Sequence, residues 1–400
     1  MSEQQRYRVL KRLASGGMAE VFVAESASIE GFRKQVAIKR VLPQLSKKSQ
    51  FIEMFLDEAR LSAHLSHSNV VSVFDIGVGD GSYFIVMEYV DGADLKAVMD
   101  YTKKVAQLVP VEAAAFVATR ICQGLSYAHE LKSDGKPLQI IHRDITPANV
   151  LITRYGEVKI VDFGLAKASS QLAASDQGVI KGKFGYLAPE TVMEKPVDQR
   201  VDVFAVGIIL WELLAGRRLF LGDTDFQTVR LVRDAVIPSL TQFNRGVTPE
   251  LDEIVKRALA RDPDARYRTA KDLGRDLTRF LFRFGRPVSD DDVAELVRTA
   301  MGTNDKPIDG TKKIADMIDL MLLEFRSLTK EEPDKPAGHS LFPESTLSFR
   351  TGPPPADGDA GTSDFSLGGL ADELEGPEPT AAPQEDSSSV ASWFRGLIPR

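Results

Sequence analysis

The spacing of apolar residues changes partway along the chain, and the change predicts two regions of different kinds. Residues 7–90 read as short strands of alternating apolar and polar positions, interrupted by a helical pattern from about 48 to 66. From about 94 to 284 apolar residues recur three and four positions apart, with brief strands only at 150–161. A period of two indicates a strand and a period near 3.6 indicates a helix. The pattern predicts an α+β fold over 7–284: a small β-rich lobe with one helix, about 7–87, and a larger, mainly helical lobe, about 91–284.

The most apolar stretch, VFAVGIILWELLA at 203–215, predicts a buried core helix. It contains Glu212 and falls short of the ~18 residues that a membrane-spanning helix needs. The N-terminal residues lack the apolar core of a secretory signal, and the one cysteine, Cys122, cannot form an internal disulfide. We therefore expect a cytoplasmic protein without a membrane span. The net charge of −7 argues against general affinity for nucleic acid.

Two amphipathic stretches follow Gly285 and predict a two-helix extension over 286–329. Ser289, followed by three aspartates, is a good helix start because a serine side chain and early acidic residues satisfy the first backbone N–H groups. The extension either packs on the main domain or offers a surface to a soluble regulator or a second copy. The apolar positions are Val293, Leu296, Val297, Ala300 and Met301 in the first stretch, and Ile314, Met317, Ile318, Met321, Leu322 and Phe325 in the second.

Residues 330–400 differ sharply in composition and predict a disordered acidic tail. Between 331 and 392 there are thirteen acidic and two basic residues, so the rest of the chain carries a net positive charge. With many Pro, Ser and Gly residues and few large apolar ones, this segment cannot offset the entropy cost of ordering. The tail ends in SWFRGLIPR, which is either a docking peptide for a regulator or a frayed end.

Short motifs follow one another through the two predicted lobes. The stretch LASGGMAEVFVA, 13–24, is a turn of small residues that phosphates can approach closely. VAIK then puts Ala37 and Lys39 on one face of a strand. Glu58 lies on an apolar helical stripe, where a carboxylate needs a cation, and Lys39 is the natural partner. HRDITPAN at 142–149 and VKIVDFG at 158–164 supply oxygen groups of the kind that Mg²⁺ prefers.

With GKFGYLAPE at 182–190, the order of these motifs resembles that of the eukaryotic-like (Hanks-type) Ser/Thr protein kinases of bacteria. The resemblance covers residues 7–284 and implies a bilobal kinase fold that uses ATP and Mg²⁺ to phosphorylate protein substrates. It implies that Asp144 accepts the proton of the substrate hydroxyl, that Lys39 contacts the ATP phosphates, and that Asn149 and Asp162 hold Mg²⁺. The residues that it implies around the nucleotide are Leu13, Ser15, Gly16, Gly17, Met18, Val21, Ala37, Lys39, Glu58, Met87, Glu88, Val90, Asp94 and Leu151. It implies structural roles for three further residues: an ion pair between Glu190 and Arg266, and a carboxylate at Asp202 that supports the catalytic loop.

This chain departs from the family's pattern in two places. Ala14 and Ala19 stand where the glycine-rich loop usually has its first and last glycines, which is costly only if the local φ is positive. Thr146 stands where the catalytic loop usually has a lysine, and Lys183 stands where the family has a threonine. We hypothesise that the two residue types have traded places, with Lys183 returning the missing charge to Asp144. The alternative is that Lys183 is solvated and the site is slow.

The resemblance also bears on regulation and on alternative functions. Arg143 before the catalytic aspartate implies control by a phosphate in the loop 165–183, whose candidate acceptors are Ser169, Ser170 and Ser175. A pseudokinase that binds nucleotide as a scaffold is the main alternative to an active enzyme. A kinase for small molecules is disfavoured by the complete APE segment and by DPDARY, 262–267, which suit a peptide-binding lobe.

Overall fold

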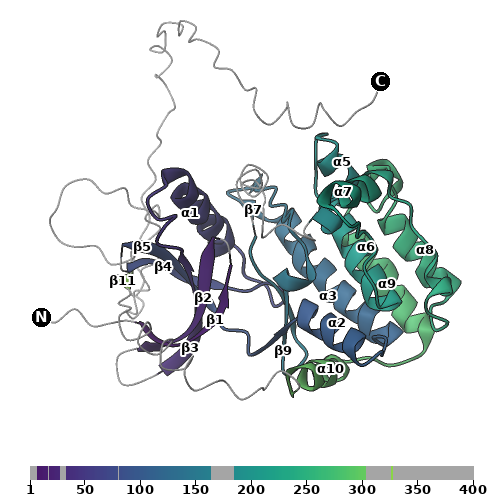
Figure 1. Ribbon diagram of the computed structural model, residues 1–400, viewed down its shortest axis with the longest axis horizontal. Helices are drawn as coiled ribbons and strands as arrows, with labels where there is room; N and C mark the ends of the chain where they lie inside the picture. Colours follow the sequence, from purple (N-terminus) through teal and green to yellow (C-terminus); the bar gives the residue numbers. More distant parts are fainter. Residues whose placement is uncertain are drawn as a thin grey trace, which may run out of the picture. The chain divides into compact units, whose positions relative to one another are not determined.

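A β-sheet with one helix is followed along the chain by a mainly helical region, as the apolar pattern predicts (Figure 1). The α+β bilobal fold class is therefore confirmed. The structure is a computed structural model, and it describes residues 7–16, 18–27, 33–79, 81–163, 184–302 and 326–327. Within these residues, no helix is both long enough and apolar enough to cross a membrane.

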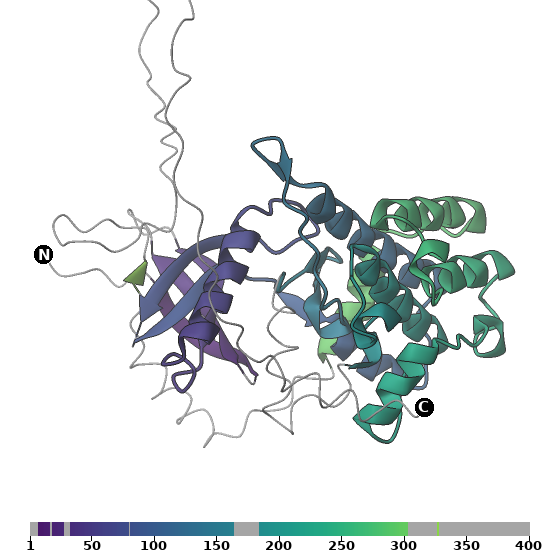
Figure 2. The same ribbon diagram turned by 90° about the horizontal axis from the view of Figure 1, so that it is seen from above.

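The first lobe is an antiparallel sheet in the order β1-β2-β3-β5-β4-β11, with α1 on one face (Figures 1 and 2). The strands alternate, so side chains from each strand reach both faces. Phe22, Ile38 and Phe84 lie in the buried cluster of one face, and Phe55 of α1 packs with Ile76 on the other. The elements are β1 (Tyr7–Ser15), β2 (Ala19–Ala27), β3 (Arg33–Val41), α1 (Ser49–Ala63), β4 (Val73–Gly79), β5 (Ser82–Glu88) and β11 (Arg326–Ser327).

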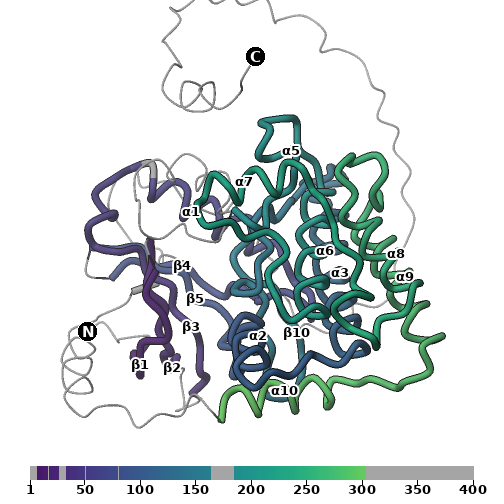
Figure 3. Tube along the Cα trace, turned by 45° about the vertical axis from the view of Figure 1, so that its right-hand side comes forward, coloured from purple at the N-terminus to yellow at the C-terminus, as the bar shows by residue number. Residues whose placement is uncertain are grey.

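The second lobe is built around α6, whose residues after Arg200 are all buried (Figure 3). A helix that is apolar all round belongs inside a core, so the predicted core helix at 203–215 is confirmed. The helices of this lobe are α2 (Leu95–Lys104), α3 (Val111–Glu130), α5 (Pro189–Val192), α6 (Arg200–Ala215), α7 (Asp225–Asp234), α8 (Pro249–Ala258) and α9 (Ala270–Phe284). Its strands are β6 (Gly92–Asp94), β7 (Lys132–Ser133), β8 (Lys136–Pro137), β9 (Val150–Thr153) and β10 (Val158–Ile160), and its short 3-10 turns are η2 (Pro147–Asn149), η3 (Phe184–Tyr186), η4 (Leu240–Gln242) and η5 (Pro263–Ala265).

Helix α10 (Asp290–Gly302) follows the second lobe and packs against α2, α3, β6 and β9 (Figure 3). Val293, Ala294, Val297 and Ala300 are buried in this contact. Asp292 accepts hydrogen bonds from the backbone N–H and the hydroxyl of Ser289, at 2.7 and 2.9 Å, which caps the start of the helix. The first predicted stretch of the extension therefore lies on the main domain.

The second predicted stretch, 314–325, lies outside the described residues, as do the tail 328–400 and the loop 164–183. At Arg326–Ser327 the predicted extension is not helical, because these two residues form strand β11 beside β4. Sequence reasoning missed this strand because pairing at a sheet edge uses backbone atoms, and a two-residue segment has no readable alternation.

Candidate active site

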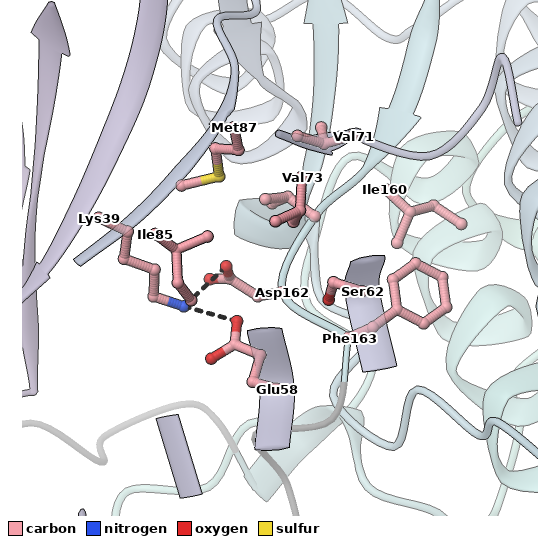
Figure 4. A pocket seen from close by; sticks show the side chains of 11 residues that line it. Lys39, Glu58, Ser62, Val71, Val73, Ile85, Met87, Ile160, Asp162 and Phe163 are labelled. Carbon is pink, nitrogen blue, oxygen red and sulfur yellow. Dashed lines mark hydrogen bonds and ion pairs between the residues drawn. The ribbon is translucent and has the colours of Figure 1, made fainter. Parts of the chain in front are cut away.

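Three charged side chains from separate elements meet between the two lobes (Figure 4). Lys39 of β3 donates to Glu58 Oε1 of α1 at 2.8 Å and to Asp162 Oδ1 at 2.8 Å. Lys39 lies in the middle of the sheet, paired with Val21 on β2 and Ile85 on β5, so its Cα position is fixed on both sides. Asp162 comes two residues after the end of β10. The structure thus pairs Lys39 with Glu58, as the sequence predicts, and adds Asp162 to the pair.

The three groups carry one positive and two negative charges in a buried place. Lys39 is 6% exposed and Glu58 is 4% exposed, and Glu58 Oε2 has no hydrogen-bond partner. Burial, together with the charge of Asp162, raises the pKa of Glu58 to about 7 against the opposing effect of Lys39. For Lys39, burial works in the opposite direction but is outweighed by the two carboxylates, so its pKa is raised. For Asp162, burial is outweighed by Lys39, and its pKa is lowered.

A cavity of about 20 Å³ lies beside this triad. That volume is enough for about one water molecule. Lys39, Glu58 and Asp162 line one side of the cavity, and Figure 4 shows Met87, Val73 and Phe163 around the rest. Glu58, which has one carboxylate oxygen without a hydrogen-bond partner, is therefore among the residues that line this space.

The catalytic-loop motif forms a network of hydrogen bonds around Asp144. Asn149 Nδ2 donates to the Asp144 carbonyl at 2.7 Å and to Asp144 Oδ2 at 3.2 Å. His142 Nδ1 accepts from the Asp144 backbone N–H at 3.2 Å, and its Nε2 lies 3.0 Å from the Val161 carbonyl. A ring that accepts at Nδ1 must carry its proton on Nε2 to bond a carbonyl, so the neutral Nε2–H tautomer fits both contacts. The buried His142 thus ties Asp144 to the strand that leads to Asp162.

Asp202 of α6 holds the same loop through hydrogen bonds from the loop's backbone. Its carboxylate accepts from the N–H groups of His142 at 2.9 Å and Arg143 at 2.7 Å, and it lies 2.8 Å from His129 Nε2. Arg143 has φ of +64° and Asp162 has φ of +65°, in a left-handed region that non-glycine residues rarely adopt. Such conformations persist only where surrounding bonds hold them, and the two hydrogen bonds to Asp202 do this for the loop.

Asn149 and Asp162 are brought close by a backbone hydrogen bond from Val161 N–H to the Asn149 carbonyl, at 3.1 Å. Asp162 stays ionised because its pKa is lowered. The two residues offer a carboxylate and an amide oxygen, which is the donor set that Mg²⁺ prefers. The residues present therefore fit the metal that the sequence resemblance implies. Within the described part of the chain, no cluster of three or more His, Cys, Asp or Glu residues forms a further metal site.

Most of the apolar residues implied around the nucleotide gather in one cluster. Ala37 and Met87 are buried in it, and Val21, Val90 and Leu151 pack against them. Leu13 lies outside this cluster and is 45% exposed. Asp94 pairs with Leu151 across β6 and β9, and its carboxylate accepts from Ala97 N–H at 2.7 Å. Asp94 therefore caps α2, which sequence reasoning did not anticipate, and one of its oxygens is already engaged.

Glu88, at the end of β5, turns its side chain toward Lys159, at 2.9 Å. Its backbone N–H donates to the Ser72 carbonyl at 2.9 Å. Both its side chain and its backbone N–H are therefore engaged by other residues of the protein. Glu88 lines a different pocket from the cavity beside Lys39.

The glycine-rich turn joins β1 to β2, and Gly16 N–H donates to the Ala19 carbonyl at 2.9 Å. Ser15 ends β1 and Met18 precedes β2, whereas Gly17 is outside the described residues. Neither Ala14 nor Ala19 is among the non-glycine residues with positive φ. Alanine at these two positions therefore causes no backbone strain.

Thr146 precedes the turn η2 in an extended conformation, with φ of −138°, and its carbonyl accepts from Asn149 N–H at 3.0 Å. Lys183 and the serines of the loop 165–183 lie outside the described residues, so the exchange of Thr146 and Lys183 stays a hypothesis. Sequence reasoning did not single out His129 or the role of His142 beneath Asp144. His129 lies within an apolar helix and His142 within the catalytic-loop motif, and neither setting indicates which distant groups the ring will bond.

The sheet lobe, the helical lobe and the charged groups between them define a bilobal protein kinase. A family model described as "Protein kinase domain" matches residues 7–276. In the fold comparison, the crystal structure of a cysteine-to-alanine mutant of the Mycobacterium tuberculosis PknI kinase domain matches 70% of this chain and 99% of that structure, with a TM-score of 0.51 and 27% identity.

Curated relatives agree with the family assignment. MasK of Myxococcus xanthus, named a tyrosine-protein kinase, is 39% identical over 276 residues, covering 69% of this chain and 43% of that protein. PrkC of Bacillus subtilis, named a serine/threonine-protein kinase, is 35% identical over 272 residues, covering 68% and 40%. PknB of Mycobacterium leprae, with the same naming, is 35% identical over 280 residues, covering 68% and 43%. The chain thus matches about two-fifths of the length of these relatives. It belongs to the protein kinase family, in its bacterial Hanks-type Ser/Thr branch.

Proposed function

We propose that this protein is an active kinase that transfers the γ-phosphate of ATP to serine or threonine hydroxyls of proteins, including its own. The observation that carries the proposal is the buried contact of Lys39 with both Glu58 and Asp162, at 2.8 Å each. A protein that only needed stability would gain little from two carboxylates around one buried ammonium, because desolvation offsets the attraction. A site that must later release Asp162 to a metal and Lys39 to a phosphate has a reason to hold them together.

Each residue has a role that follows from its place. Lys39, oriented by Glu58, would bind the α- and β-phosphates, while the turn Ser15–Met18 would cover them with backbone N–H groups. Asp144, oriented by Asn149 at 3.2 Å, would accept the hydroxyl proton of the substrate. Asn149 and Asp162 would hold Mg²⁺, which when bound neutralises charge on the phosphates. Since little covalent chemistry falls to the protein, positioning and electrostatics supply most of the rate.

The test is phosphate transfer from labelled ATP with Mg²⁺, comparing the wild type with Asp144→Asn. We expect transfer to the protein itself or to a generic protein substrate, and a loss of at least about 10²-fold in the variant, because a general base contributes about that much. Acid hydrolysis of the product should yield phosphoserine or phosphothreonine. Phosphotyrosine would place the chain with the relative named a tyrosine kinase. Nucleotide binding with no transfer by the wild type would favour the pseudokinase alternative.

We further propose that Lys183 supplies the charge that Thr146 lacks, with its amine near Asp144 and the γ-phosphate. A lysine has the reach and three donors for this role. Lys183→Ala should lower the transfer rate by on the order of 10²-fold while changing ATP affinity little, because the lost contact forms mainly in the transition state. Lys181→Ala, two residues earlier in the same segment, is the matched control. Near-normal turnover in Lys183→Ala would reject the exchange.

A further inference from the structure

An open groove of about 610 Å³ lies where the starts of β3 and β4 meet the end of β5, away from the charged triad. None of its lining residues belongs to the lining of the cavity beside Lys39. Its walls come from the starts of β3 and β4, the loop after α1, the end of β5, and β10. We call it the rear groove. It is lined by Lys34, Gln35, Ser66, His67, Ser68, Ser72, Phe74, Glu88, Tyr89 and Lys159.

The rear groove has one cation available for a ligand. Lys159 is committed, because its amine contacts Glu88 at 2.9 Å and donates to the Ser68 carbonyl at 3.1 Å. Lys34, by contrast, pairs with no carboxylate in the described part of the chain. Its amine lies 4.4 Å from the ring centroid of Phe74, which is itself 46% exposed. An exposed aromatic ring beside an unpaired ammonium suits an extended peptide that brings acidic side chains.

Strand β11 lies beside β4 (Figure 1), and Phe74 of β4 lines the rear groove. It pairs antiparallel with β4, Arg326 opposite Val78 and Ser327 opposite Gly77. In an antiparallel pair the next residues must run toward lower numbers in β4, and at about 3.3 Å per residue the start of β4 is only about 10 Å away. Continued in register, Lys330 comes opposite Phe74, at the groove.

We propose that the segment 328–334 of this same chain, LTKEEPD, occupies the rear groove and ties the acidic tail to the back of the kinase domain. Glu331 and Glu332 come next in the register after Lys330, and Lys34 is the cation that they would meet. Pro333 has no N–H to give to a strand ladder, so the pairing would end where β4 begins. Charge complementarity and the direction of β11 point to one occupant.

Two features of the groove restrict how the segment binds. Glu88 would repel an acidic side chain, so the carboxylates of the segment should lie on the Lys34 side of Phe74 rather than near Lys159. The backbone N–H of Ile76 already donates to Asp75 Oδ1 at 2.9 Å, so this N–H is not available for a backbone hydrogen bond between β4 and the segment. The segment would therefore be held mainly by side-chain contacts with Phe74 and Lys34.

Disulfide trapping in the full chain tests this placement without any measurement of kinase activity, so its failure is distinct from failure of the proposed function. The parent protein suits it, because the one cysteine, Cys122, is buried. Ser72→Cys with Glu332→Cys, which the same register places opposite each other, should form an intrachain disulfide under mild oxidation, seen as a mobility change on a non-reducing gel; this pair leaves Phe74, Lys34 and Glu331 in place. Ser72→Cys with Glu375→Cys is the matched control and should not. Equal trapping in both pairs, no trapping in either, or a disulfide-linked dimer would overturn the proposal.

A charge exchange tests the chemistry of the contact. In the doubly substituted protein, Lys34→Glu should slow disulfide formation by about fivefold, the upper end for an exposed ion pair. Glu331→Lys added to Lys34→Glu should restore the rate, because the opposite charges meet again. Lys11→Glu, on β1, is the control for a change in net charge alone. If Lys34→Glu and Lys11→Glu have the same effect, the acidic residues are not what the groove binds.

Discussion

Two buried ionic contacts in this protein each join a basic side chain to carboxylate groups but are built differently. Arg266 and Glu190 form a matched pair in the helical lobe, with two parallel bonds of 2.6 and 2.7 Å. The three remaining guanidinium donors reach the carbonyls of Ala260, Arg261 and Arg200, and the plane lies over the Phe204 ring at 4.6 Å. Lys39 instead shares its one charge between two carboxylates, and Glu58 Oε2 is left without a partner.

The difference separates architecture from chemistry. A planar guanidinium whose donors are all used has nothing left to offer a ligand, so the Arg266 pair fixes helix positions. The Lys39 triad has an excess of negative charge, a raised pKa at Glu58 and a cavity beside it. A group in that state can exchange partners when a phosphate and a metal arrive. Burial alone therefore does not distinguish these two contacts, whereas the balance of charge and hydrogen bonds around each of them does.

The largest expected effect comes from removing the shared cation. Lys39→Met should lower phosphate transfer by on the order of 10³-fold, because the phosphate contact and the orientation of Asp162 are both lost. The loss of folding stability should be small by comparison, because Glu58 can take up a proton when its partner is gone. Labelled-ATP transfer and urea denaturation measure the two effects.

Lys11→Met, which replaces an exposed lysine of β1 in the same sheet, is the matched control and should keep its activity. If Lys39→Met unfolds the protein as readily as the loss of Arg266 does, the two contacts are both structural and the comparison fails.

The matched pair should show the reverse behaviour. Arg266→Leu leaves Glu190 buried without a partner and should lower the free energy of unfolding by about 3–5 kcal/mol. Arg266→Leu with Glu190→Leu should recover much of this loss, because an apolar pair of similar volume removes the unpaired charge. Urea denaturation of both variants measures it. A double variant no more stable than Arg266→Leu alone would mean that packing, rather than the unpaired carboxylate, accounts for the loss.

The two lobes and the pairing of Lys39 with Glu58 could be predicted because both follow from the periodic spacing of apolar residues along strands and helices. Alternation placed Lys39 on the side of β3 that faces the cleft, and the helical stripe placed Glu58 toward it. Asp162 was predicted to hold a metal, but its bond to Lys39 depends on how the end of β10 meets the sheet, and no local pattern encodes that. The hydrogen bonds of His142 depend likewise on two carbonyl and N–H groups distant in sequence.

The C-terminal part was read less well. Amphipathic spacing found α10, since four of its apolar residues are buried, yet β11 has only two residues and bonds through its backbone. The resemblance placed Asp94 among the residues around the nucleotide, and its capping of α2 went unnoticed. A capping aspartate can be read from sequence when it precedes a helix, so this signal was present.

The smallest expected effect is a pH dependence that belongs to the triad alone. Glu58 has a pKa of about 7 in the folded protein against 4.5 for an ordinary glutamate. Between these values the folded state holds a proton that the unfolded chain has lost, so the free energy of unfolding should fall as pH rises through this window and level off above it. Glu58→Gln removes the titrating group, and the neighbours Asp162 and Lys39 titrate outside the window because their pKa values are lowered and raised. Urea denaturation at about pH 5 and about pH 8 should therefore show a loss of stability in the wild type that the variant lacks. If the wild type instead gains stability relative to Glu58→Gln as the pH rises over this range, then Glu58 is ionised throughout and Lys39 compensates its charge.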